Sequence, residues 1–445
     1  MEIKMKKFVV FALAALMIMS FAACASENKD DTSDTSSVSE KETSVSGTEE
    51  STETETATDE AIAVQIQEEP AARVEVKTDG VDNQASKPSV KEETAASKVE
   101  PSSDKQNEEK PAESAPSSFE KDPQKIIVSA KKEMIFTKKP TDSCHASTVL
   151  PLDDGTVVTA WFAGSSESDD DVKILTSVRS TDGVWSEPLR VSADPNVAHW
   201  NPVLFQRTDG TIVLYFKVGK DTEYWKTYYS TSLDGKSWSV PRELVPGDNS
   251  GGRGPVKNKP IRLTDGTVLA PASTEIDGKY RCFVDVSYDD GLTWNKTDII
   301  DSKYCVSFKV PMIQPTLWQS ADGSVHMFTR TKVGKIYRSD SYDGGRTWCR
   351  AYATKLPNNN SGIDLDTDAN GRIFLAYNPV GIPGIRTPLT LAVSLDDGQT
   401  FTKIKTFETG LAEYSYPAVV VKGDTIHITY TYERDFIAYW QIKIK

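Results

Sequence analysis

A short motif returns five times along this chain, and its spacing limits the folds that the chain can adopt. The full form, Ser-x-Asp-x-Gly-x-Thr-Trp/Phe, begins at Ser287, Ser341 and Ser394, and shortened forms begin at Ser180 and Ser232. Successive serines lie 52, 55, 54 and 53 residues apart. A constant period of this length is typical of proteins built from stacked or radially arranged repeats.

The residues of this motif, the Asp box, are those of a tight turn. An Asp side chain accepts hydrogen bonds from backbone N–H groups, Gly supplies a positive φ, and the final aromatic ring returns to a core. These structural requirements of a turn are enough to explain why the motif repeats, and neither catalysis nor metal binding has to be invoked. We therefore interpret the Asp boxes as structural.

A second signal precedes each Asp box and defines the repeat. Asp-Gly or Asn-Gly stands between β-rich runs at Asp154, Asp209, Asp265, Asp322 and Asn370, and a variant Gly-Asp begins at Gly423. Such dipeptides are the strongest short hairpin signal. Each unit is predicted to hold four antiparallel strands, and six units indicate an all-β, six-bladed β-propeller over residues 123–445. The strand-like stretch 125–136 is expected to complete the last blade and close the ring.

The first 122 residues are predicted to lie outside this fold. Three lysines precede the apolar run 8–19, which is too short to span a bilayer, and Phe-Ala-Ala-Cys24 follows. This end resembles a bacterial lipoprotein signal, so residues 1–24 are expected to be a signal peptide and Cys24 the lipidated residue. The alternative is secretion with an unmodified Cys24. The protein is thus expected at the bacterial cell surface, anchored to the membrane only through this lipid.

Residues 25–122 have the composition of a disordered linker. The stretch 25–120 holds 25 acidic and 9 basic residues and almost no aromatic ones. It cannot bury enough apolar surface to offset the entropy lost on ordering. Residues 121–445 hold equal numbers of acidic and basic residues, so net charge gives the folded part no reason to bind nucleic acid. Cys144, Cys282, Cys305 and Cys349 lack zinc-type spacing, and their pairing stays open.

Strand direction predicts which face carries the chemistry. The starts of first strands and the ends of second strands meet on one face, and the Asp boxes lie on the other. A residue before Pro is expected to be extended and to hold its side chain near the axis. The side chains that we single out on this face for substrate binding are Trp200, Asn201, Arg253, Lys259, Gln314 and Asn378. Cations beside aromatic rings suit an acidic glycan, bound by a monomer that needs no metal or other cofactor.

The chain resembles the sialidase (neuraminidase) superfamily of Asp-box propellers. The resemblance implies that Arg330 and Arg386 bind a sugar carboxylate. It also implies that Tyr414, within Glu-Tyr-Ser-Tyr-Pro, is the nucleophile and that Asp170 is the acid/base, with Asp169 and Asp171 as rivals.

Two positions depart from the family pattern. The early Arg-Ile-Pro of the family becomes His145-Ala-Ser, and the glutamate that activates the tyrosine falls on Gln314. A neutral Gln cannot accept a proton from tyrosine, and a histidine lacks the two-pronged geometry of arginine. Glu275, on the neighbouring blade, is a candidate substitute base. The chain is most similar to the divergent branch labelled sialidase-like or exo-α-sialidase.

Three functions remain open. The first is a sialidase-like exo-glycosidase that removes a terminal acidic sugar, with Arg330, Arg386, Asp170 and Tyr414 in the roles above. The second is a lyase that cleaves a terminal uronate-linked sugar of the rhamnose–glucuronate type, with His145 and Tyr414 as base and acid. The third is a lipoprotein that binds glycans without catalysis.

Overall fold

The computed structural model of the chain describes residues 119–302 and 308–445. The expected signal peptide, Cys24, all but the last residues of the expected linker, and Cys305 lie outside these ranges. Within them, no helix is long and apolar enough to cross a membrane. Cys144, Cys282 and Cys349 are free thiols, and burial raises the pKa of Cys144 to about 12.

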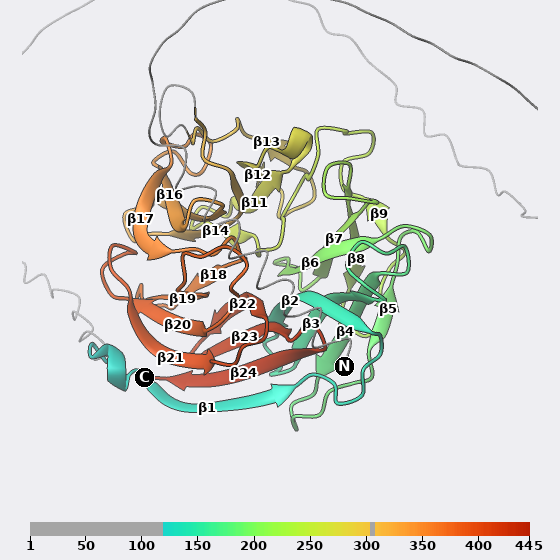
Figure 1. The fold of residues 1–445 in the computed structure, drawn as a ribbon, viewed down its shortest axis with the longest axis horizontal. Helices are drawn as coiled ribbons and strands as arrows, with labels where there is room; N and C mark the ends of the chain where they lie inside the picture. Colours follow the sequence, from blue (N-terminus) through green and yellow to red (C-terminus); the bar gives the residue numbers. More distant parts are fainter. Residues whose placement is uncertain (1–118, 303–307) are drawn as a thin grey trace, which may run out of the picture. The chain divides into compact units, whose positions relative to one another are not determined.

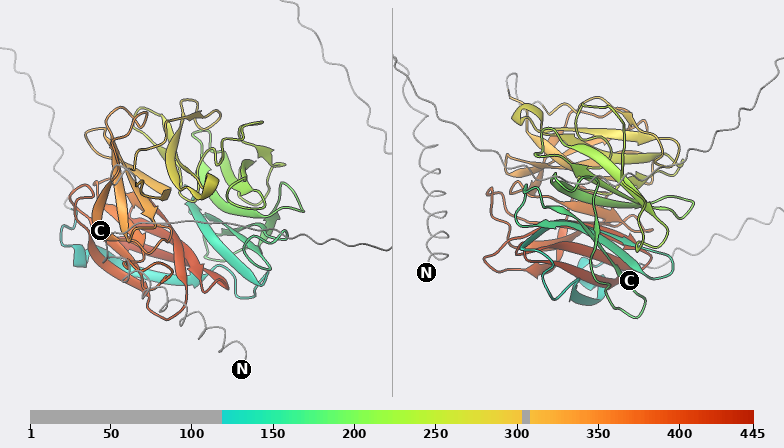
Figure 2. Two further views of the ribbon diagram at one scale, coloured as in Figure 1. Left: turned by 45° about the horizontal axis from the view of Figure 1, so that its top comes forward. Right: turned by 90° about the vertical axis from the view of Figure 1, so that its right-hand side faces the viewer.

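The described residues form six four-stranded antiparallel sheets around a common centre, a β-propeller (Figures 1 and 2). Blade one holds β2 (Ser143–Pro151), β3 (Val157–Gly164), β4 (Lys173–Arg179) and β5 (Leu189–Val191). Blade two holds β6 (His199–Gln206), β7 (Ile212–Val218), β8 (Lys226–Ser232) and β9 (Arg242–Glu243). Blade three holds β10 (Ile261–Arg262), β11 (Val268–Thr274), β12 (Arg281–Ser287) and β13 (Asn295–Lys296).

Blades four to six complete the ring. Blade four holds β14 (Met312–Gln319), β15 (Val325–Thr331), β16 (Lys335–Ser341) and β17 (Tyr352–Pro357). Blade five holds β18 (Asp364–Thr367), β19 (Ile373–Tyr377), β20 (Leu389–Ser394) and β21 (Thr402–Glu408). Blade six holds β22 (Tyr414–Lys422), β23 (Thr425–Tyr432), β24 (Phe436–Ile444) and β1 (Ile127–Met134). Two short 3₁₀ turns are η1 (Pro123–Lys125) and η2 (Ile276–Gly278).

Strands from the two ends of the described fold close the ring. β1 pairs antiparallel with β24, for example Ala130 with Ile442, and so forms the outer strand of blade six. On the inner side, β22 of blade six packs against β2 of blade one. The predicted six-bladed propeller and the closing role of residues 125–136 are both confirmed.

The core lies between neighbouring blades. One cluster joins Ile174 and Phe162 of blade one to Leu214 and Phe216 of blade two, and similar clusters fill the other junctions. A sheet covered on both faces needs apolar residues at nearly every position. This explains why every residue of β3 is buried.

The three full Asp boxes share one pattern of hydrogen bonds. In blade three the Ser287 hydroxyl donates to Asp289 at 2.8 Å and accepts from the Gly291 N–H at 2.8 Å. Asp289 also accepts from the backbone N–H and the hydroxyl of Thr293. The boxes at Ser341 and Ser394 repeat this pattern. The boxes are therefore turns that satisfy their own polar groups.

One residue near the inner strand of each blade has a left-handed backbone. These residues are Ala146 (φ 54°), Asn201 (40°), Lys257 (78°), Gln314 (51°), Asn360 (58°) and Tyr416 (53°). In β2, β6, β14 and β22 the ladder slips at this point, as in a β-bulge. The expectation of an extended backbone before proline is thus wrong at Asn201, Gln314 and Tyr416. The bulge sets φ there, and it overrides the steric preference of the dipeptide.

Candidate functional site

Tyr416 lies at the centre of a group of charged side chains contributed by four blades. Its hydroxyl oxygen accepts a hydrogen bond from Arg330 Nη1 at 2.5 Å and lies 3.4 Å from Gln314 Nε2. Its ring faces three cations, with the Arg386 guanidinium carbon at 5.3 Å from the ring centroid, the Arg330 carbon at 5.6 Å and Lys257 Nζ at 5.9 Å. We call this group, with His145, Glu413, Arg434 and Asn360, the Tyr416 cluster.

The strained backbone aims these side chains. A non-glycine residue with left-handed φ costs of order 1 kcal/mol or more and persists only where its surroundings fix it. Four of the six left-handed residues, Lys257, Gln314, Asn360 and Tyr416, belong to the cluster. Such strain gathers at functional sites. The left-handed positions of these four residues therefore direct one side chain from each of blades three to six toward a common point.

The arginines of the cluster keep unused hydrogen-bond donors. Arg330 donates through Nε to Asn360 at 3.0 Å and through Nη1 to Gln314 and Tyr416. Arg386 donates through Nη1 to Glu413 at 2.5 Å. Among the described residues, no hydrogen bond engages Nη2 of Arg330 or Nε and Nη2 of Arg386. These N–H groups remain available to a bound acceptor.

His145 is a buried, neutral base within the cluster. Its ring is 1% exposed and lies 4.2 Å from the Tyr416 ring, centroid to centroid. Burial lowers its pKa well below the usual value, and Arg434 and Arg386 add to this effect. Nδ1 contacts Thr431 Oγ1 at 2.8 Å and lies 3.8 Å from Glu413, whose carboxylate favours the tautomer with the proton on Nδ1. Nε2, which has no hydrogen-bond partner, is then left as a free acceptor.

Glu413 partly balances the cations. It accepts from Arg386, lies 3.1 Å from Arg434 Nε and accepts from Ser415 at 2.7 Å. Burial raises its pKa, but the two arginines outweigh burial and the net shift is downward, so Glu413 is ionised. The partly exposed Glu167 carboxylate forms a second ion pair with Arg434, at 2.6 Å from its Nη1.

The balance of charge around Tyr416 remains positive. Arg330, Arg386 and Arg434 outnumber Glu413 and Glu167, while burial lowers the pKa of Lys257 to about 7 and raises the pKa of nearby Glu275, which disfavours its ionised form. Buried charges are normally paired. A group with surplus cations and unused N–H donors is suited to an anionic ligand, and a carboxylate fits the fork of an arginine best.

The side chain of Tyr416, and not that of Tyr414, contacts the arginine side chains, although the Tyr414 backbone N–H donates to the Arg386 carbonyl at 2.9 Å. The Tyr414 hydroxyl donates to Glu433 at 2.9 Å, and its ring packs against Tyr432 at 5.1 Å in the core. Burial and the Glu433 carboxylate raise the pKa of Tyr414. Gln314, which the sequence pattern pairs with Tyr414, contacts Tyr416 and Arg330.

Other predicted site residues lie apart from these contacts. Asp170 is exposed on the loop between β3 and β4, where its backbone carbonyl accepts from Lys173. Glu275 accepts from Thr222 at 3.3 Å and faces Arg330 more distantly. Trp200 is a core residue whose indole donates to the Gly219 carbonyl at 2.8 Å. Asn201 is buried at its left-handed position, where the described residues give its side chain no hydrogen bond.

Three further predicted ligand residues have structural partners instead. Arg253 is held by Asp285 and Asp248, with its Nη2 at 2.8 Å from Asp285. Lys259 donates to the Leu365 carbonyl at 2.7 Å. Asn378 donates to the carbonyls of Pro388 and Tyr414. Their N–H groups are thus engaged within the protein.

Sequence reasoning does not single out Glu413, whereas it places Tyr416 and Arg434 on the site face without giving either a role. Tyr416 carried a signal, since it precedes Pro417 as Gln314 precedes Pro315 in blade four. Aligning the blades on this Pro would have placed Tyr416 rather than Tyr414 opposite Gln314. Arg434 follows β23, the second strand of its blade, and Arg330 lies near the end of β15, the second strand of blade four, so the same strand-end position marks both.

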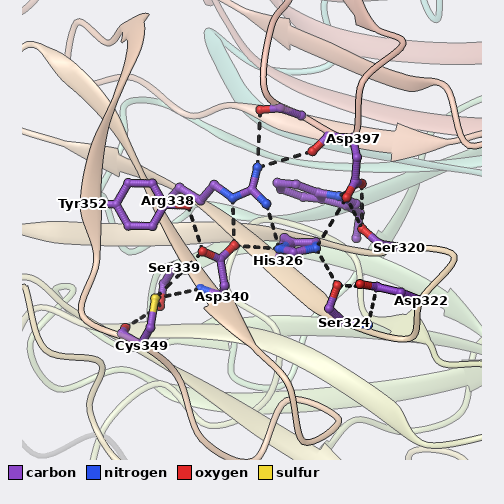
Figure 3. A network of polar contacts seen from close by, with 12 residues as sticks. Ser320, Asp322, Ser324, His326, Arg338, Ser339, Asp340, Cys349, Tyr352 and Asp397 are labelled. Atoms are coloured by element: carbon purple, nitrogen blue, oxygen red, sulfur yellow. Dashed lines mark hydrogen bonds and ion pairs between the residues drawn. The ribbon is translucent and has the colours of Figure 1, made fainter.

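A Ser–His–Asp array in blade four is a competing candidate, but its contacts are structural (Figure 3). Ser324 Oγ lies 2.9 Å from His326 Nε2, and His326 Nδ1 lies 2.6 Å from Asp340. The Ser324 hydroxyl donates to Asp322 rather than to the histidine, and Arg338 shares Asp340 at 2.7 Å. With its proton directed to a carboxylate, Ser324 is not activated by His326 as a nucleophile. The array ties β15 to β16.

No group of three or more His, Cys, Asp or Glu side chains in the described ranges is arranged to hold a metal ion. The Tyr416 cluster is a set of cations around a phenol.

The fold and the cluster together define an Asp-box propeller with a cationic site on the face opposite its Asp boxes. The chain belongs to the family described as BNR repeat-like domain, which matches residues 155–428. Among curated protein sequences, none matches this chain.

Solved structures of the same architecture are similar to this chain at low identity. A protein of unknown function from Dyadobacter fermentans is 18% identical with a TM-score of 0.59, over 72% of this chain and 100% of that one. The Hadza microbial sialidase Hz136 is 16% identical with a TM-score of 0.58, over 68% of this chain and 66% of that one. Trypanosoma rangeli sialidase, in complex with the inhibitor DANA, is 14% identical with a TM-score of 0.56, over 71% and 60%. These likenesses show a shared, sialidase-like fold.

Proposed function

We propose that this protein is a carbohydrate-active enzyme, a sialidase-like exo-glycosidase that removes a terminal acidic sugar, sialic acid or a similar one, from glycans. The observation that carries the proposal is the hydrogen bond from Arg330 to the Tyr416 hydroxyl, with unused N–H donors on Arg330 and Arg386 beside the Tyr416 ring. The sialidases among the structures of this fold support the same substrate class.

In hydrolysis the cluster residues and Asp170 have separate roles. The free donors of Arg330 and Arg386 bind the sugar carboxylate as a charge-assisted fork. The Tyr416 oxygen bonds to the anomeric carbon as the bond to the leaving oxygen breaks, and Asp170, on its exposed loop, gives that oxygen a proton. The Tyr416 proton passes to neutral His145, whose ring lies beside Tyr416, because Gln314 cannot accept it. Water then releases the sugar and returns the protons.

One observation favours a second candidate, a lyase acting on a terminal uronate. The unpartnered Nε2 of neutral His145 is a base beside cations that can bind a uronate carboxylate. His145 would remove the proton on the carbon next to the carboxylate, and the electron pair would form a carbon–carbon double bond. The adjacent carbon–oxygen bond would break, with Tyr416 giving the leaving oxygen a proton.

The products distinguish the two reactions. We would incubate the protein with sialosides and with rhamnosyl-glucuronate glycans and measure the product masses. A hydrolase adds water to its products, whereas a lyase leaves an unsaturated uronate that absorbs in the near ultraviolet. We expect saturated sugar. Release of an unsaturated product that is lost in His145→Gln would establish the lyase instead.

Matched arginine variants test the site itself. Arg330→Ala and Arg386→Ala should each abolish detectable turnover, because each removes a carboxylate contact. Arg350→Ala is the control, since Arg350 is 64% exposed in its side chain and pairs with Asp301 elsewhere in blade four. If the protein binds glycans but turns over no acidic glycan, its function is the third one, a lipoprotein that binds glycans without catalysis.

We also propose that the protein is exported and held at the bacterial cell surface by a lipid on Cys24. The support is the sequence of residues 1–24 alone. Cys24→Ser should move the protein from the membrane fraction to the medium and end its labelling by a radioactive fatty acid. An unlabelled wild-type protein in the medium would favour plain secretion.

A further inference from the structure

The Asp-box face carries exposed side chains that the turn does not require. The second position of the box makes no hydrogen bond in the turn, yet it holds Tyr288 and Tyr342, which are 62% and 80% exposed. Leu233 and Leu395 occupy the same position in blades two and five and are 81% and 41% exposed. Large apolar side chains in water on one face mark an interaction surface when they line a common hollow.

Tyr288 and Tyr342 do line one hollow. It has a volume of about 420 Å³ and lies between blades three and four, with Asp265, Gln319 and Arg346 as polar walls. Each tyrosine stands on a box fixed by its own hydrogen bonds, so the backbone that carries the rings is rigid. The walls are rigid too, because Gln319 accepts from the Thr264 N–H at 2.9 Å across the blade junction.

A second hollow continues the first. It has a volume of about 640 Å³, lies between blades four and five, and shares Thr264 and Gln319 with its neighbour. Leu395 and Trp318 line it, and Asp397 connects its walls by accepting from Ser320 and from the Trp318 indole (Figure 3). We call the two hollows together the Asp-box groove. Because two hollows adjoin, the groove suits a chain of several sugars rather than one.

The charge of the groove is opposite to that of the Tyr416 cluster. Carboxylates of Asp265, Asp322, Asp396 and Asp397 lie along it, and hydrogen bonds within the turns lower the pKa of the first three, so they are ionised. Arg346 is the arginine in its lining. Carboxylates accept hydrogen bonds from sugar hydroxyls but repel sugar acids.

We propose that the Asp-box groove is a second carbohydrate-binding site, which takes the chain of a neutral glycan on the face opposite the Tyr416 cluster. Tyr288 and Tyr342 stack on the sugar rings, and the turn carboxylates and Arg346 hold the hydroxyls. A protein partner fits this surface less well, because a stable interface buries about 800 Å² per partner around an apolar centre. In the groove the exposed rings are separated by charged turns.

The test titrates the full-length protein, by calorimetry, with neutral hexasaccharides of glucose, N-acetylglucosamine, mannose, galactose and xylose. We expect at least one to bind, and affinity to rise with chain length. Tyr288→Ala and Tyr342→Ala should each weaken that binding at least tenfold, while Tyr342→Trp, which keeps a ring, should retain it. Tyr224→Ala is the control, since Tyr224 is 72% exposed on the loop between β7 and β8, away from the boxes.

Several results would overturn the proposal. Absence of binding by every neutral glycan would do so, as would binding that is unchanged in the Tyr288→Ala/Tyr342→Ala double variant. Self-association that sedimentation detects and Tyr342→Ala abolishes would assign the groove to a second copy of the chain. Arg386→Ala separates this site from the proposed activity, because it should leave neutral-glycan binding intact.

Discussion

At the scale of single residues, the site depends on whether the side chain of Tyr414 or that of Tyr416 reaches Arg330 and Arg386. Tyr414 and Tyr416 lie on the same strand, and both are buried. The left-handed φ of Tyr416 turns its ring toward Arg330 and Arg386, whereas Tyr414 keeps the strand register and enters the core with Tyr432. One backbone dihedral thus decides the assignment.

The paired variants Tyr416→Phe and Tyr414→Phe test this assignment. Tyr416→Phe removes the oxygen on Arg330, so kcat on an acidic glycan should fall at least 100-fold with little change in Tm. Tyr414→Phe removes a hydrogen bond to Glu433 and should lower the unfolding free energy by about 1 kcal/mol while turnover is kept. The opposite pattern of kcat would restore Tyr414 as the functional tyrosine.

Buried histidines make the fold sensitive to acid. Burial lowers the pKa of His199 and of His427 to about 4 each, and it lowers the pKa of His145 well below its usual value. Between pH 6.5 and about 5 the unfolded chain binds protons at these histidines and the folded protein does not, so stability falls as pH falls. The loss should be about 2 kcal/mol per histidine between pH 7.5 and pH 5.

Denaturant unfolding at a series of pH values measures this loss. His427→Gln is the informative variant, because His427 contacts Tyr439 far from the Tyr416 cluster. In this variant the loss of unfolding free energy between pH 7.5 and pH 5 should be smaller by the contribution of one histidine, about 2 kcal/mol. A wild-type unfolding free energy that is constant from pH 7.5 to pH 5 would show that these histidines bind protons equally in both states.

At the scale of the element, the Asp box is expected to stabilise its blade and to leave catalysis alone. Asp289→Ala removes three hydrogen bonds in the box of blade three, and the unfolding free energy should fall by about 1 to 2 kcal/mol. Turnover per folded molecule should not change, because the box lies opposite the cluster. Asp298→Ala, an exposed position in the same blade, should match wild type in both measurements. Lost turnover at an unchanged Tm would place the box in the site.

The elements were predictable from sequence where their signals are local and repeated. Asp-Gly turns and Asp boxes specify hairpins through contacts within a few residues, so the number of blades and the closing strand 125–136 follow from counting. The direction of Tyr416 is not local. Its dipeptide with Pro417 favours an extended backbone, and contacts with Arg330 and Gln314 of another blade accompany the bulge that overrides it. Arg253 and Lys259 were misplaced because partners such as Asp285 and Leu365 are distant in sequence.

At the scale of the whole molecule, the ring brings six inner strands to one axis, so a site can draw on blades far apart in sequence. The Tyr416 cluster combines Lys257 of blade three with Arg330, Arg386 and Arg434 of later blades. This arrangement holds only while the ring is closed. The closing strand β1 is therefore required for the site although none of its residues lies in it.

Two deletions separate the strand that closes the ring from the sequence before it. Removing residues 25–118 should leave Tm and turnover of a soluble substrate unchanged, because that stretch has too few apolar residues to contribute a core. Extending the deletion through Met134 removes β1, exposes the edge of β24 and takes buried Ile126 out of the core, so the protein should lose cooperative unfolding or become insoluble. Thermal unfolding and glycan turnover, measured on both truncated proteins beside the full chain, check each expectation. A shorter deletion that already lowers Tm by several degrees would show that residues before 119 stabilise the propeller.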